Sequence, residues 1–230
     1  MWIPHMLSRM GGKDLNYSVN RMIRLGTRSE KVQQHIDRQN EEVFKISSIS
    51  GGRILQFFWA NPLREGIIEE LREKYGSWKF RGIKLHQSCH PFRIQSAHFH
   101  RIADFASSNK FPVFIHLYSK KEILDFIEVS RSYETIFITG HLIGLELFIR
   151  NRKQVGDNIC FDISCPPLVP VHRIELALKT FGPRKIVMGS DTPFGRDNLH
   201  EIISRVRSLG LPVRETGMIL GNNMKEILGI

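Results

Sequence analysis

The sequence is short of cysteine, of long apolar runs and of charge concentrated in blocks. Its three cysteines, Cys89, Cys160 and Cys165, have no paired spacing, which excludes a disulfide framework or a cysteine-based zinc site, and we expect them to be packed small side chains. The apolar runs are far shorter than the ~20 residues of a membrane-spanning helix. The start shows no basic segment followed by an apolar stretch, so we expect no secretory signal. These absences predict a cytoplasmic protein.

Basic residues outnumber acidic ones, with 33 Lys and Arg against 23 Asp and Glu, a formal charge of +10. There is no block of five or six like charges, and no zinc-finger or RNA-binding aromatic motif occurs. A diffuse positive charge favours an anionic partner but does not indicate nucleic acid. We therefore expect a small-molecule substrate, with no nucleic-acid partner favoured and no membrane partner, and a homo-oligomer is left open.

From residue 53 onward, short apolar runs alternate with longer amphipathic stretches. Six runs have the length and two-sided apolar character of strands in a covered parallel sheet. These runs are Arg53–Ala60, Arg81–His86, Val113–Leu117, Ile136–His141, Ile159–Ser164 and Ile186–Ser190. The helical stretches are Leu63–Tyr75, Ser96–Ser107, Lys121–Ser130, Leu145–Lys153, His172–Thr180, Asp197–Leu209 and a tail at Thr216–Leu228. The alternation predicts a parallel α/β sheet, with the aromatic run Phe57–Trp59 in its core.

The spacing of these units indicates a barrel. Six strands in residues 53–230 give about 30 residues a unit, as in a (β/α)8 TIM barrel. The first 52 residues do not supply two more units, because residues 14–46 are polar and helix-like, with a break at Gly26 and Thr27, and only Trp2–Leu7 could end a strand. We expect one TIM-barrel-like domain over residues 1–230, N-terminally incomplete, with an atypical segment at 1–50. It would have six to seven recognisable strands and two open sheet edges, unless a partner or the N-terminal segment covers them.

Polar residues close several of the expected strands. Lys84 and His86, His116, His141 and Asp191 stand at the ends of four runs, and the carboxyl ends of barrel strands share one mouth. Imidazole and carboxylate are the usual ligands of a catalytic divalent ion, which acidifies its bound water. Each residue also has a structural alternative: a core histidine at His116, a close backbone approach at His141, a turn cap at Asp191 or a salt bridge at Lys84. Their joint occurrence favours a common site.

Four motifs follow one another in order along the chain. They are Gly82–His86 (GIKLH), Pro112–His116 (PVFIH), Gly140–Gly144 (GHLIG) and Gly189–Pro193 (GSDTP). Together they resemble the motifs of the amidohydrolase-related metal-dependent hydrolases, a TIM-barrel branch of the amidohydrolase superfamily. That branch includes relatives of aminocarboxymuconate-semialdehyde decarboxylase and pyrone-dicarboxylate lactonase. The resemblance covers roughly residues 40–230.

The resemblance implies a function and roles for single residues. It implies hydrolysis, or the related decarboxylation or lactone opening, of a small carboxylated organic substrate by water activated on one divalent metal ion, zinc. His116 and Asp191 match metal ligands. His141 and Asp191 match catalytic residues, with Asp191 accepting the proton of the attacking water. Lys84 and His86 face the site and are expected to bind substrate.

One family motif has no counterpart. A first-strand His-x-His, which supplies two further metal ligands, is absent near the start of this sequence, where His5 stands alone. His98-Phe99-His100 has the pattern but lies in a helical stretch, where residues two apart point about 200° away from each other. We therefore expect weak metal binding. Either the chain is a shortened version of a complete enzyme, or it is a relative that kept the fold for binding.

Two other functions stay open. A TatD-type metal-dependent deoxyribonuclease is also a histidine-rich barrel, and the stretch Gln95–Phe99 leading to Pro112–His116 fits it. Against that function, the run Arg81–His86 lacks the acidic residue which that family places there. The second alternative is a metal-free barrel that only binds a ligand. Such a protein has no activity, so the variants His116→Ala and Asp191→Ala would cause no change in activity.

Overall fold

The computed structural model describes residues 21, 22, 24, 25, 30–192 and 197–230. Within these residues six parallel strands form one sheet in the order β1-β2-β3-β4-β5-β6. The strands are β1 (Phe57–Trp59), β2 (Gly82–His86), β3 (Val113–His116), β4 (Phe137–Thr139), β5 (Ile159–Asp162) and β6 (Ile186–Val187). Because strands adjacent in sequence are adjacent and parallel in the sheet, this is the wall of an incomplete TIM barrel, as the sequence predicted.

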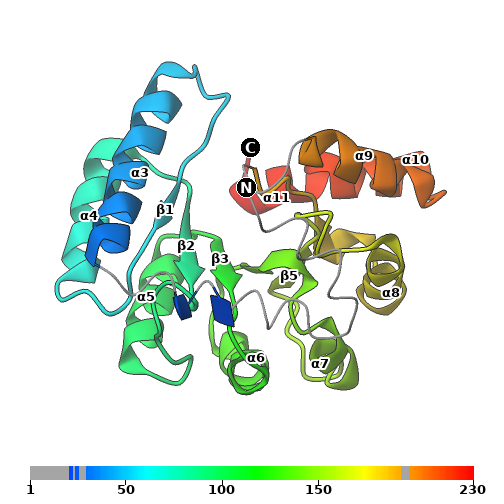
Figure 1. Ribbon diagram of the computed structural model, residues 1–230, viewed down its shortest axis with the longest axis horizontal. Helices are drawn as coiled ribbons and strands as arrows, with labels where there is room; N and C mark the ends of the chain where they lie inside the picture. Colours follow the sequence, from blue (N-terminus) through cyan, green and yellow to red (C-terminus); the bar gives the residue numbers. More distant parts are fainter. Residues whose placement is uncertain (1–20, 23, 26–29, 193–196) are drawn as a thin grey trace.

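Helix α3 (Glu30–Ile49) precedes the first strand, and the other helices follow strands along the chain. These are α4 (Ile67–Trp78), α5 (Ala97–Ser108), α6 (Lys120–Val129), α7 (Leu145–Arg150), α8 (Val171–Phe181), α9 (Asn198–Ser208), α10 (Val213–Gly217) and α11 (Asn223–Leu228). Figure 1 shows α5, α6 and α7 on one side of the sheet, α3 at its β1 end and α9–α11 at its other end. All six expected strands and the expected helices are present, with ends shifted by a few residues. None of the described helices is both long and apolar enough to cross a membrane.

The main core lies between the sheet and its outer helices. In α5 the buried side chains Phe99, Ile102 and Ala106 recur at spacings of three and four, so they form one face of the helix. That face packs in one cluster with strand residues such as Ile83 and Ile115, which are fully buried. Burying a side chain of this size stabilises the fold by about 1.5–3 kcal/mol. The strands are therefore held in place mainly from outside.

The inner face of the sheet carries a smaller apolar cluster. Ile138 in β4 lies in register with Cys160 in β5, and both pack with Val187 of β6. Met224 and Ile227 of the C-terminal helix α11 pack against this cluster. The C-terminal helix therefore covers apolar side chains on the side of the sheet that faces a barrel interior.

The free edge of β1 is covered by a side chain of α3. Asn40 donates through Nδ2 to the carbonyl oxygen of Trp59 (3.0 Å) and accepts from the Trp59 backbone N–H through Oδ1 (2.9 Å). The amide of Asn40 thus makes the two hydrogen bonds that a neighbouring strand would make. In the described sheet β1 is an edge strand, and a residue of the N-terminal segment covers this edge at Trp59. The possible strand end at Trp2–Leu7, His5, and the break at Gly26 and Thr27 lie outside the described residues.

Replacing Asn40 by alanine is expected to lower the free energy of unfolding by about 1–3 kcal/mol. Asn40 is only 6% exposed, so the Trp59 backbone groups would lose partners at a site with little access to water. Urea unfolding followed by circular dichroism measures the change. Arg38→Ala, at an exposed position of the same helix, is the matched control. Equal stability of the two variants would contradict the edge-capping role.

Candidate active site at the carboxyl ends of the strands

The structure brings the predicted site residues together at the carboxyl ends of the strands. His86 and His116 are register partners in β2 and β3, and their rings stack with centroids 4.0 Å apart. His141, just after β4, meets the ring of His116 edge-on with centroids 5.1 Å apart. Its Nε2 atom lies 3.9 Å from Oδ2 of Asp191, which follows β6. The four side chains therefore form a continuous row across the sheet.

The stacked pair His86 and His116 is buried, at 7% and 6% exposure. Burial is the largest cause that lowers the pKa of each ring well below its usual value, and the nearby charge of Lys84 lowers both further. Both imidazoles are accordingly neutral near pH 7. A neutral imidazole can donate one hydrogen bond and accept another, so this pair suits a polar ligand.

A buried network that the sequence reasoning missed holds His141. The Nδ1 atom of His141 lies 2.9 Å from the hydroxyl oxygen of Ser164, and this hydroxyl donates to Oδ2 of Asp162 (2.5 Å). The same carboxylate accepts from the backbone N–H of His141 (3.0 Å), and its Oδ1 accepts from the N–H of Ser164 (3.1 Å). Because the Ser164 hydroxyl gives its proton to Asp162, Nδ1 of His141 is the donor in the first bond. Nε2 is then an acceptor on the side of Asp191.

One signal in the sequence could have revealed this network. Asp162 is an ionisable residue inside an otherwise apolar strand, and such residues need buried partners. Gly189 makes room for this network because it has no side chain. A Cβ atom there would lie 2.8 Å from Oδ1 of Asp162 and 3.0 Å from Cβ of Ser164. The glycine of the GSDTP motif therefore leaves space for the carboxylate.

Three residues that follow the strands have left-handed backbone conformations. The φ angles are 54° at His141, 60° at Cys165 and 57° at Asp191. For residues other than glycine this costs about 1–2 kcal/mol each, and such strain gathers at functional sites. Two of these strained residues, His141 and Asp191, are the ones whose side chains face each other.

Asp191 is placed to carry a proton. Burial is the largest cause that raises the pKa of its carboxyl group, and the charge of Asp162 adds to the rise, while His141 and Lys84 oppose it. Cys165 forms a side-chain hydrogen bond with Asp191, and burial raises the pKa of that thiol to about 12. Burial also raises the pKa of Cys160 to about 11. All three cysteines are buried, as expected for packed thiols.

Lys84 extends between two aromatic rings beside the histidines. Its Nζ atom lies 4.6 Å from the centroid of Trp59 and 5.8 Å from that of Phe114. Burial lowers the pKa of the amine, although Asp191 and Asp162 oppose this. Trp59 was expected in the core, but it is half-buried and stacks on His86 with centroids 5.9 Å apart. Its buried indole Nε1 has no hydrogen-bond partner among the described residues.

Helix α3 also reaches the rim of this site. Gln33 accepts through Oε1 from Nε2 of His90 (2.6 Å), a buried residue in the loop after β2. Trp59 meets the ring of His90 edge-on with centroids 6.3 Å apart. Burial, and then the charge of Arg64, lowers the pKa of His90 to about 4. The helix therefore positions the loop that borders Trp59.

This lowered pKa predicts acid sensitivity. The unfolded chain holds a proton on His90 below about pH 6.5 and the folded chain only below about pH 4, so stability falls as the pH drops between these values. From pH 7 to pH 5, His90 is expected to remove about 2 kcal/mol of stability. In His90→Gln the loss between the two pH values should be smaller by that amount, as measured by urea unfolding. An identical loss in both proteins would contradict this.

The described residues do not fit a metal ion with three protein ligands. Among them, no group of three His, Cys, Asp or Glu side chains could hold an ion. His86 and His116 stack face to face, so their nitrogens lie side by side instead of converging, and His141 engages Ser164 through Nδ1. Catalytic zinc generally takes three protein ligands. Metal binding by His116 and Asp191 stays a prediction.

The second histidine pattern lies away from the site, as expected. His98 and His100 are on α5, with the buried Phe99 between them. Nδ1 of His100 pairs with the hydroxyl of Tyr133, and Nδ1 of His98 lies 3.1 Å from Nη2 of Arg101. These partners are on the helical layer outside the sheet.

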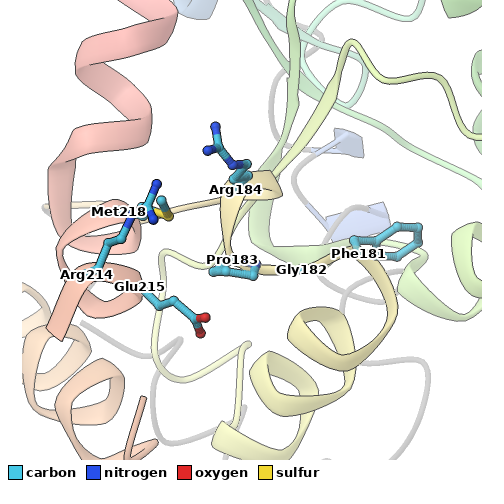
Figure 2. A pocket seen from close by; sticks show the side chains of 7 residues that line it. All are labelled: Phe181, Gly182, Pro183, Arg184, Arg214, Glu215 and Met218. Carbon is cyan, nitrogen blue, oxygen red and sulfur yellow. The ribbon is translucent and has the colours of Figure 1, made fainter. Parts of the chain in front are cut away.

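A cavity of about 310 Å³ lies at the other end of the sheet. It is lined by Phe181, Gly182, Pro183, Arg184, Arg214, Glu215 and Met218, and Figure 2 shows Glu215 directed toward Pro183. Residues 183–185 directly precede β6, so the cavity borders the amino end of that strand. It is therefore separate from the row of site residues at the carboxyl ends.

Comparisons with known proteins agree with this architecture. A family model described as Amidohydrolase matches residues 16–213. A 2,6-dihydroxybenzoate decarboxylase, solved with 2,6-dihydroxybenzoate, is 13% identical with a TM-score of 0.71, over 87% of this chain and 78% of that one. A probable 2-pyrone-4,6-dicarboxylic acid hydrolase from Acinetobacter baumannii is 13% identical with a TM-score of 0.65, over 83% and 79%. A 5-carboxyvanillate decarboxylase from Novosphingobium aromaticivorans, solved with manganese, is 10% identical with a TM-score of 0.67, over 87% and 72%. No curated protein matches the chain.

Proposed function

The chain belongs to the amidohydrolase family, and on this premise we propose that it binds a small carboxylated organic molecule at the strand-end site and acts on it as a carboxy-lyase or hydrolase. The observation that carries the proposal is the row formed by His86, His116, His141 and Asp191, with Lys84 beside it. The related solved structures include decarboxylases and a hydrolase of carboxylated ring compounds. Decarboxylation is the reaction that these residues support best.

In the proposed site, binding and proton transfer belong to different side chains. Lys84 and His86 contact the substrate, and the buried indole N–H of Trp59 would gain a partner in a substrate oxygen. Asp191 holds the proton that replaces the carboxylate on carbon, because its raised pKa keeps it protonated at higher pH than an ordinary aspartate. His141, fixed through Ser164 and Asp162, keeps the acceptor Nε2 directed at Asp191 and so orients its protonated carboxyl group.

No step in this proposal is assigned to a metal ion, because the described donors do not fit one. A zinc ion would have His116 and Asp191 as its predicted ligands, which is two ligands where three are usual. We expect elemental analysis of the purified chain to give far less than one zinc or manganese per chain. We also expect turnover to be unchanged after treatment with EDTA. One tightly bound metal per chain, with activity lost on its removal, would contradict this prediction.

Binding of simple carboxylic acids tests the proposed function directly. Thermal-shift and calorimetric titrations would use benzoate, 2,6-dihydroxybenzoate and acetoacetate, with the uncharged benzamide as the matched control. We expect the acids to bind and benzamide to fail. Release of CO2 from the acids that bind then reports turnover. Binding without turnover would favour a barrel that only binds its ligand, and release of nucleotides from added DNA would favour the nuclease alternative.

A further inference from the structure

Lys84 lies in the middle of β2 with an aromatic residue opposite it on each side. It is in register with Trp59 of β1 and with Phe114 of β3, and its amine lies near both rings. In the part of the chain that the structure describes, Lys84 forms no ion pair. The two rings and the charges of Asp191 and Asp162 favour its ammonium form, but burial is the largest effect and lowers the pKa of the amine. An environment of this kind makes a lysine nucleophilic.

The same amine is within reach of a ligand. Lys84 is only half-buried, so part of its side chain is exposed. Lys84 and His86 are two residues apart in β2, so their side chains lie on the same face of the sheet. The indole N–H of Trp59, which has no hydrogen-bond partner among the described residues, adds a donor next to Lys84. A nucleophile, a proton carrier and a free donor thus occupy one end of the sheet.

We propose that Lys84 forms a covalent imine with the carbonyl carbon of a 3-oxo carboxylic acid, and that this imine accepts the electron pair released when CO2 leaves. The inference rests on the proposed function and narrows its substrate class to acids with a carbonyl group one carbon beyond the α-carbon. The imine nitrogen of Lys84 would then be the electron acceptor in the decarboxylation.

The steps balance without any further reagent. The lone pair of Nζ forms a bond to the carbonyl carbon. The carbonyl oxygen takes one proton from the amine and one from solvent and leaves as water, giving a protonated imine. The bond between the α-carbon and the carboxylate then breaks, CO2 departs, and the electron pair forms an enamine as the imine nitrogen is neutralised. Asp191 gives its proton to the α-carbon. Water then adds to the imine carbon and releases a ketone, free Lys84 and one proton to solvent, while a proton from solvent returns to Asp191.

Trapping with sodium cyanoborohydride tests the imine on the wild-type chain. The protein is incubated with acetoacetate or oxaloacetate and the reductant, and the adduct is located by intact mass and peptide mapping. We expect one reduced adduct, at Lys84. Malonate, a carboxylate without a keto group, should bind without forming an adduct. Lys84→Arg keeps the charge but should lose the adduct, while Lys121→Arg, at an exposed lysine paired with Asp125, should keep it.

The outcomes separate this inference from the proposed function. Binding of both acetoacetate and malonate to the wild-type chain, with no adduct at Lys84, overturns the imine and leaves the proposed function in place. No binding of any carboxylate in thermal-shift titrations overturns both. An adduct on other lysines that persists in Lys84→Arg also overturns the imine. The mapping uses the wild-type chain, so this test does not depend on how the Lys84 variant folds.

Discussion

Replacement of Asp191 by asparagine is expected to lower turnover of a carboxylated substrate by about 10²–10⁴-fold, the usual contribution of a positioned proton donor. Asparagine has nearly the same shape but cannot deliver a proton to carbon. Its amide would still sit 3.9 Å from His141, so we expect substrate binding to change much less than turnover. Steady-state kinetics would show the loss in kcat, with KM within a few-fold of the wild-type value.

The pH dependence gives a second readout of the same prediction. Burial raises the pKa of Asp191, so the wild-type rate should decline as the pH rises through that raised value and the proton donor is lost. The decline should be absent from the residual activity of Asp191→Asn. Asp197→Asn, at an exposed position before α9, is the matched control and should retain wild-type rates. Wild-type turnover in Asp191→Asn would remove Asp191 from the reaction.

Replacement of Asp162 by alanine is expected to cost about 3–5 kcal/mol of stability. Asp162 is 3% exposed and accepts three hydrogen bonds, from two backbone N–H groups and the Ser164 hydroxyl. Alanine would leave these donors buried without an acceptor. Urea unfolding at pH 7 measures the loss. Asp162→Asn, which keeps a carbonyl oxygen at the site, should lose clearly less stability, and equal losses would argue against the hydrogen bonds as the cause.

The activity of Asp162→Asn and Ser164→Ala tests the positioning role of the network. Both variants should lower kcat with little effect on KM, because they loosen the ring of His141 without touching the substrate. Ser164→Ala removes the partner of Nδ1, so nitrogen NMR shifts of the His141 ring should show a changed tautomer. A purely structural role would lower stability and leave the tautomer unchanged.

The fold could be predicted from sequence because its signals are local. Runs such as Ile159–Ser164, apolar on both faces, mark covered parallel strands, and the spacing of three and four in α5 marks an outer helix. The cover of the β1 edge could not be predicted in this way. Asn40 and Trp59 are 19 residues apart, and nothing in the pattern of α3 indicates that one amide side chain completes a strand ladder.

The candidate site could be predicted as a set of residues but not as a geometry. Strand ends carry His86, His116, His141 and Asp191, and the topology of a parallel sheet is enough to bring them together. The sequence suggested His116 and Asp191 as metal ligands and His86 as a substrate-binding residue. The sequence did not indicate that His86 stacks on His116, which follows because residues in register on adjacent parallel strands lie side by side.

The sequence by itself determined the alternation of strands and helices, the family and the row of polar residues at one end of the sheet. These depend on the periodicity of apolar side chains and on motifs within a few residues. Only the tertiary structure decided that His141 is held by Ser164 and Asp162, that Asn40 covers β1, and that Lys84 lies between Trp59 and Phe114. Those contacts depend on strand register and on left-handed backbone at single residues, which aim side chains in directions that residue spacing does not encode.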